Sequence, residues 1–111
     1  MPVVSNTSPL LNLAIIGHLA LMYEQFGEIF IPQAVLEELQ IEQGLPGSQS
    51  MREATEKGWL QVKEVKDHRF VKMLQADLDK GEAEAIALSL QVKAKWAILD
   101  ERGVWSIERG E

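Results

Sequence analysis

Four short segments, far apart in the chain, carry oxygen-bearing side chains of the kind that bind hard divalent cations. Their key residues are Asn6, Glu38, Glu84 and Asp100, of which three are carboxylates and the first is an amide. Clustered carboxylates repel one another unless a cation lies among them, and such oxygen ligands suit Mg²⁺ or Mn²⁺. A bound ion of this kind can activate water and orient a phosphodiester. The four residues therefore predict a metal-dependent nuclease site, with an asparagine where a carboxylate would complete the set.

These side chains can meet only if the elements that carry them end at a common edge. Apolar and β-branched stretches predict strands at residues 2–6, 28–31, 59–65 and 96–99. Apolar residues at helical spacing, bounded by turn formers, predict helices at residues 9–16, 18–26, 32–39, 49–57, 67–77 and 80–92. The first of these helices is expected to begin at Pro9 with Ser8 as its cap. Strands that alternate with helices predict an α/β fold with a parallel sheet.

Sites in an open parallel sheet form at the carboxyl ends of its strands. Asn6 and Asp100 follow two predicted strands, and Glu84 lies in the first turns of a helix that should start at the same edge. Glu38 is about six residues beyond Pro32, or roughly 9 Å along its helix, and helical side chains lean back toward the N-terminus. The four side chains are therefore expected to converge.

Each of these residues also has a purely structural interpretation, because 17 acids in 111 residues make acids at strand and helix ends unsurprising. Asn6 can cap the first helix as well as bind a metal, and Asp100 can merely end a strand. Glu84 can be a ligand or a solvated surface residue. Glu82 is better explained as part of a capping box, and Glu37 as a surface acid beside the inward Glu38.

Composition narrows the class of protein further. The chain of 111 residues has 46% hydrophobic residues, which predicts one domain with a real core. It has no cysteine, which excludes disulfides, thiolate zinc sites and cysteine nucleophiles and fits a cytoplasmic location. No signal peptide or membrane span is visible. The net charge of −6 is unusual for a nucleic-acid binder, but a cation among the acids would offset part of it, and a basic protein partner would suit it equally.

The four segments, in this order, resemble the PIN-domain family, specifically a VapC-like branch of uncharacterised proteins. The matching stretches are residues 4–14, 30–39, 81–88 and 98–102. The resemblance implies a three-layer sandwich around a central parallel sheet of about four strands. It also implies a ribonuclease that uses Mg²⁺ or Mn²⁺, often as the toxin of a toxin–antitoxin pair.

Carried over by position, the family's acids fall on Asn6, Glu38, Glu84 and Asp100, which would be the catalytic metal ligands. Ser8 falls on a small hydroxyl residue that helps to position the metal or the substrate. The family usually has an aspartate at the position of Asn6. It also continues beyond residue 102 with a helix, a strand and a last helix, which residues 103–111 do not match. The resemblance therefore implies a single PIN-like domain over residues 1–111, truncated after about residue 102.

Two functions of different classes follow. The first is a PIN-like, metal-dependent ribonuclease, a toxin of weak or lost activity, with RNA as substrate and an antitoxin protein as partner. The second is a catalytically silent remnant that keeps a protein-interaction surface; an unrelated small α/β binding module is a third, weaker interpretation. A sheet that ended after Asp100 would expose an edge strand and apolar helix faces, so a homodimer or larger assembly is expected. Trp105 and Ile107 are candidates to cover such a patch.

Overall fold

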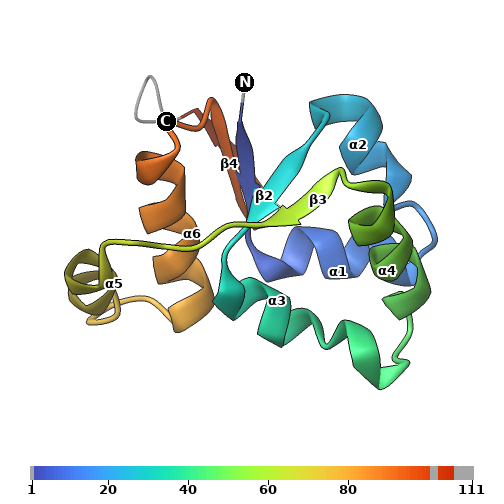
Figure 1. The fold of residues 1–111 in the computed structure, drawn as a ribbon, viewed down its shortest axis with the longest axis horizontal. Helices are drawn as coiled ribbons and strands as arrows, with labels where there is room; N and C mark the ends of the chain where they lie inside the picture. Colours follow the sequence, from blue (N-terminus) through green and yellow to red (C-terminus); the bar gives the residue numbers. More distant parts are fainter. Residues whose placement is uncertain (1, 101–102, 107–111) are drawn as a thin grey trace.

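The computed structural model describes residues 2–100 and 103–106, with side chains described through residue 99. This part of the chain forms five strands, six α-helices and one 3₁₀ turn, with helices after each of the first three strands (Figure 1). The strands are β1 (Val3–Ser5), β2 (Ile29–Ile31), β3 (Leu60–Val62), β4 (Trp96–Asp100) and β5 (Gly103–Ser106). The helices are α1 (Thr7–Ile15), α2 (Ala20–Phe26), α3 (Gln33–Leu39), η1 (Ile41–Gln43), α4 (Ser48–Lys57), α5 (His68–Leu74) and α6 (Lys80–Gln91).

The strands form one sheet in the order β3-β2-β1-β4-β5. The first four are parallel, with Val3 of β1 paired to Ile29 of β2 and to Trp96 of β4. This confirms the expected α/β fold with a parallel sheet of four strands. It also means that β1, β2, β3 and β4 all end at one edge, which is called the carboxyl edge below.

The expectation that the sheet ends after Asp100 is wrong. Residues Gly103–Ser106 form β5, which pairs antiparallel with β4, with Ala97 opposite Trp105. Only two residues separate the strands, so a parallel crossover is impossible and an antiparallel pair is the one arrangement available. The outer side of β4 is therefore covered within the chain. This weakens the reasoning that led to a homodimer, although the oligomeric state itself stays a prediction.

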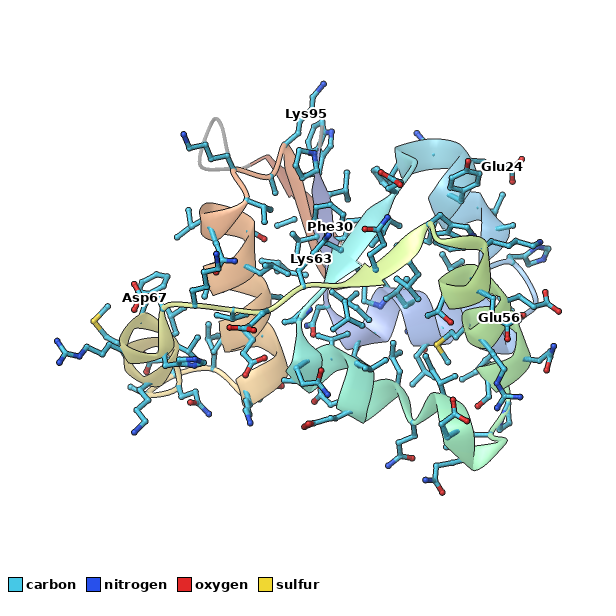
Figure 2. All side chains as sticks on the ribbon, in the orientation of Figure 1. Glu24, Phe30, Glu56, Lys63, Asp67 and Lys95 are labelled. Carbon is cyan, nitrogen blue, oxygen red and sulfur yellow. The ribbon has the colours of Figure 1, made fainter. Side chains whose placement is uncertain are left out.

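One face of the sheet, called the α6 face here, is packed mainly with small side chains. Its buried members include Val4 of β1 and the α6 residues Ala83, Ala85 and Ala87. Phe30 of β2 packs against the same cluster, and the Lys63 ammonium lies 4.8 Å from the centre of its ring (Figure 2). Alanines let the backbone of α6 come close to the sheet, which brings the first turns of this helix near the carboxyl edge.

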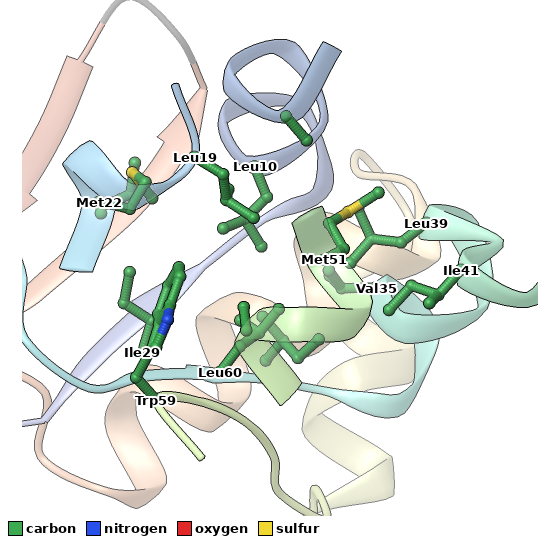
Figure 3. Packing of buried hydrophobic residues seen from close by; sticks show 14 of the residues in the cluster. Leu10, Leu19, Met22, Ile29, Val35, Leu39, Ile41, Met51, Trp59 and Leu60 are labelled. Atoms are coloured by element: carbon green, nitrogen blue, oxygen red, sulfur yellow. The ribbon is translucent and has the colours of Figure 1, made fainter. Parts of the chain in front are cut away.

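The opposite face, called the α1 face, is built from large apolar side chains. Its buried residues come from alternate positions of the strands and from the helices α1, α2, α3 and α4 (Figure 3). They include Leu10, Met22, Leu39, Met51 and Trp59. Val3 belongs to this cluster whereas Val4 belongs to the other, as expected for neighbouring residues of a strand. The interleaved large side chains make this face the main hydrophobic core.

Candidate active site

Asn6 lies at the end of β1 and joins three elements at the carboxyl edge. It is 8% exposed, and its backbone N–H donates to the Ile98 carbonyl at 2.9 Å. Its side-chain Oδ1 accepts from the Thr7 N–H at 2.7 Å, and its Nδ2 donates to the Leu99 carbonyl at 2.9 Å. Asn6 is thus the cap of α1 and is also tied to the residue before Asp100.

The cap of α1 differs from the sequence expectation. The helix begins at Thr7 with Asn6 as its cap, two residues before the predicted start at Pro9. Asparagine caps helices at least as well as serine, so the first suitable residue after the strand takes this role and Ser8 falls inside the first turn. Ser8 is exposed there. The structural interpretation of Asn6 as a cap is therefore confirmed, and it is compatible with a ligand role because the Oδ1 atom retains a second lone pair.

Glu38 reaches the same edge through two contacts. The Thr7 hydroxyl donates to Glu38 Oε1 at 2.6 Å, although these residues are 31 positions apart. On its other side the carboxylate packs against Gly81 in the first turn of α6, where any side chain would collide with Glu38 Oε1. The glycine leaves room for this carboxylate, and a methyl group here would displace the flexible end of Glu38. Gly81 lies in a helix and has no positive φ.

Glu84 faces the start of α3. Its Oε1 accepts from the backbone N–H of Ala34 at 3.1 Å. The residue that precedes α3 is Pro32, which has no side-chain acceptor, so the free N–H groups of this helix need a partner from elsewhere. Glu84 supplies that partner, and the positive end of the helix favours its negative charge. Glu84 therefore has a structural role whether or not it also binds a metal.

The helices α3 and α6 bring the two glutamates close together. Ala34 contacts Glu84, and one turn further along α3 Glu38 contacts Gly81. The two contacts are one helical turn apart, at about 5.4 Å per turn, so both glutamates lie along the interface between α3 and α6. Thr7 then links Glu38 to Asn6. These contacts place Asn6, Glu38 and Glu84 at one seam of the carboxyl edge, where α3 lies between α1 and α6 (Figure 1).

Asp100, the fourth candidate ligand, is described in its backbone only. The backbone of Asp100 ends β4, directly after the Leu99 carbonyl that Asn6 binds, whereas its side chain lies outside the described residues. Among the residues that are described, no three His, Cys, Asp or Glu side chains gather where they could hold a metal ion. Asn6 is an amide, so the described part of the site offers two carboxylates and one amide oxygen. The ligand set of four stays a prediction.

The charges of the two glutamates are not neutralised within the described part of the chain. The ion pair found there joins Arg52 to Glu42 at 3.7 Å, and no described cationic side chain lies within 4 Å of Glu38 or Glu84. Each carboxylate has about four acceptor sites, of which the contacts with Thr7 and Ala34 use one each. The donor chemistry therefore fits a hard divalent cation.

Two residues of this site were missed by the sequence reasoning. Thr7, not Ser8, gives the hydroxyl that bonds to Glu38. Gly81 makes room for the same carboxylate. Thr7 follows Asn6 directly, and a glycine inside a helix beside acids is a signal of close approach. However, neither signal indicates that the partner is Glu38, which is 31 positions from Thr7 and 43 positions from Gly81.

A family model described as PIN domain matches residues 2–107. The chain belongs to the PIN domain family. The match spans almost the whole chain, including all four segments that carry the candidate ligands, and it confirms the resemblance inferred from the sequence. A PIN domain is a nuclease-type fold, and PIN domains generally use divalent metals. No curated protein and no solved structure matches the chain. Among the described residues, no helix is long and apolar enough to cross a membrane.

Proposed function

We propose that this PIN domain is a ribonuclease dependent on Mg²⁺ or Mn²⁺. The observation that supports it most is the pair of hydrogen bonds by which Thr7 holds Glu38 and Asn6 together. These two hydrogen bonds lie at the carboxyl edge, where Glu84 and the end of β4 also lie. Three widely separated segments would not need to meet in this way merely to build a core, because these side chains contribute little apolar burial.

The residues have distinct roles in this proposal. Glu38, Glu84 and Asp100 would bind the ion with carboxylate oxygens, and Asn6 would contribute its amide oxygen. A divalent ion bound there supplies an acidified water as nucleophile and neutralises charge on the phosphodiester. Thr7 orients Glu38 through its hydroxyl, and the Ala34 N–H orients Glu84. Ser8, which is exposed in the first turn of α1, would contact the substrate.

A catalytically silent protein-interaction module is the second candidate, and the amide of Asn6 favours it. Both ends of this amide are engaged, since Oδ1 accepts from Thr7 and Nδ2 donates to the Leu99 carbonyl. A carboxylate at this position would lack the N–H that binds Leu99. Asn6 thus stabilises the edge without a cation, which an aspartate would do less well.

The partners follow from the same two candidates. As a toxin, the protein would bind an antitoxin, and its net charge of −6 suits a basic segment of that partner. A homodimer remains part of this proposal. Growth arrest when the protein is expressed would support the toxin role if co-expression of a small basic protein from the neighbouring gene relieves it. Sedimentation at micromolar concentration would test the dimer, and a monomer would contradict it.

Cleavage of single-stranded RNA by the purified protein in Mn²⁺, Mg²⁺ or EDTA tests the nuclease proposal. The sharpest variant is Glu84→Gln, because the glutamine oxygen can still accept from the Ala34 N–H while the charge is lost. We expect Glu84→Gln and Asp100→Asn to fold normally and to lose cleavage. Equal cleavage by these variants and the wild type would point to a contaminating nuclease. No cleavage by the wild type in any metal would leave the silent interaction module as the function.

A further inference from the structure

A cavity of about 550 Å³ opens at the end of β3, beside the candidate active site. Its lining comes from four elements: the end of β3 and the segment that follows, the start of α3, the start of α5, and α6. The lining residues are Gln33, Val62, Lys63, Glu64, Val65, His68 and Glu84. Glu84 is shared with the candidate metal site, so the cavity adjoins that site at this residue.

The cavity lies on the carboxyl edge, like the acids. The strand order places β3 two positions from β1, so the cavity mouth is about 10 Å from Asn6 along the sheet, at ~4.8 Å per strand. Glu84 and the start of α3 lie between them, because Gln33 precedes the Ala34 N–H that Glu84 accepts from. A linear ligand lying along this edge would meet the acids first and the cavity next.

Three side chains of the cavity carry N–H donors, which is notable in a chain with net charge −6. The Lys63 ammonium is held over the Phe30 ring, 4.8 Å from its centre, so its stem is already ordered (Figure 2). His68 is exposed at the start of α5, and imidazole offers at least one N–H donor in either protonation state. Gln33 adds an exposed amide from α3.

The wall that carries Lys63 is fixed to the helix that carries Glu84. The Gln91 side chain accepts from the Lys66 N–H at 2.9 Å and donates to the Glu64 carbonyl at 2.8 Å. The Gln91 amide therefore makes two hydrogen bonds to the backbone after β3, one as acceptor and one as donor. Gln91 lies seven residues after Glu84 on α6, which is two turns along the same face. The distance between the donors and the acid is thus set by a rigid helix.

We infer that this cavity binds the RNA strand next to the cleavage site, with Lys63 and His68 as phosphate-contacting, positioning residues. The inference rests on the proposed ribonuclease function and adds the place where substrate is held. Acids that bind a cation do not by themselves attract a polyanion, so an acidic PIN domain needs positive donors near its site. Lys63 is the cation of the lining and His68 adds an imidazole donor, on the side of Glu84 that faces β3. The lining also holds the carboxylates of Glu64 and Glu84, and a divalent ion bound at Glu84 would offset the charge of that group.

Binding of a labelled single-stranded RNA, measured by fluorescence anisotropy in Ca²⁺ at several salt concentrations, tests the inference. The variant is Lys63→Met, which keeps the stem over Phe30 and removes the charge. One lost phosphate contact on a single strand should lower the slope of log K against log salt by about 0.7. Affinity should fall about fivefold near 0.1 M salt. His68→Ala should weaken binding further when combined with Lys63→Met.

Lys95→Met is the matched control, because it removes the same charge from an exposed lysine at a distant end of the molecule (Figure 2). It should leave the salt slope unchanged. Equal effects of Lys63→Met and Lys95→Met, or no RNA binding by the wild type, would overturn the inference. RNA that binds through Lys63 but is never cleaved in Mn²⁺ or Mg²⁺ would support the inference while refuting the ribonuclease chemistry. A gel at the end of each titration shows whether the RNA stayed intact.

Discussion

The two faces of the sheet are packed with buried side chains of different size. The α1 face interleaves large side chains such as Leu10, Met51 and Trp59, whereas the α6 face is lined by alanines of α6 together with Leu88. Large apolar side chains give the greater gain from burial, so most of the stability should come from the α1 face. Alanines give less, but they allow two backbones to approach closely. The candidate active site lies at the seam where the two faces meet.

The residues that should contribute most of the stability therefore lie apart from the residues of the candidate active site. At the seam, α6 comes near enough to α3 for Gly81 to touch Glu38 and for Glu84 to cap α3. Bulky residues on α6 would move the helix away and break both contacts. The small-residue face thus sets the position of the acids, and the large-residue face keeps the sheet folded. Substitutions on the α1 face should therefore change mainly the free energy of unfolding, and substitutions at the seam should change mainly the binding of metal.

The largest effect is expected for Leu10→Ala on the α1 face. Leu10 is 0% exposed, and truncating a buried leucine costs about 2–5 kcal/mol through lost burial and a new cavity. Urea denaturation should show this loss, whereas the metal affinity of the folded protein should stay unchanged. A variant of normal stability that fails to bind Mn²⁺ would mean that the α1 face positions the site directly.

Asn6→Asp should have an intermediate effect that depends on metal. The substitution replaces the N–H that donates to the Leu99 carbonyl with an oxygen, so the metal-free protein should lose about 1–3 kcal/mol. The added charge should strengthen cation binding, so Mn²⁺ should raise the melting temperature of the variant more than that of the wild type.

Asn6→Ala is the control for this comparison, because it also removes the bond to the Leu99 carbonyl and adds no charge, although it additionally removes the acceptor of the Thr7 N–H. It should be destabilised without any gain in the response to Mn²⁺. If Asn6→Asp is as stable as the wild type in EDTA, the bond to Leu99 contributes nothing. If it responds to Mn²⁺ like Asn6→Ala, Asn6 is not a ligand position.

Thr7→Val should change stability by less than about 1 kcal/mol, because the bond from Thr7 to Glu38 is exposed. Loss of an orienting partner of a metal ligand typically lowers metal affinity about 10–100-fold. Calorimetric titration with Mn²⁺ should show this weakening. Thr7→Ser keeps the hydroxyl and should bind like the wild type, so equal affinities of the valine and serine variants would exclude an orienting role.

The smallest effect on stability, with the opposite sign, is expected for Gly81→Ala. Alanine is a better helix former than glycine by up to about 1 kcal/mol, and Gly81 has no positive φ that would oppose it. The new methyl group would, however, push the Glu38 carboxylate away from its place beside Thr7. We expect unchanged or higher stability together with weaker Mn²⁺ binding.

A double-mutant cycle with Glu38→Gln isolates the cause of the Gly81→Ala effect. If the methyl group acts through this carboxylate, Gly81→Ala should have no additional effect on Mn²⁺ binding once Glu38 is replaced. Additive losses would show that the glycine acts through α6 itself. Tighter binding by Gly81→Ala would contradict the contact seen between these residues.

Much of the fold could be predicted because its signals are local. Asp79 caps α6 through the Glu82 N–H, and the apolar run before Asn6 forms β1, both as the sequence indicates. The start of α1 was predicted two residues late, since several consecutive residues could cap it and only the end of the strand selects one. The β5 strand was missed because a short strand gains stability only from the neighbour it pairs with.

The sequence by itself determined which chemistry is available: oxygen donors at four segments, no thiolate, and strand–helix alternation that directs them to one edge. Only the tertiary structure decided how they are held. Thr7 contacts Glu38, Glu84 contacts Ala34, and Gln91 contacts Lys66 in the segment after Lys63. The residues of each pair are at least 25 positions apart in the sequence. Residue types specify what a side chain can bind. Its partner depends on helix packing, which is set by the volumes of buried side chains across the whole sheet.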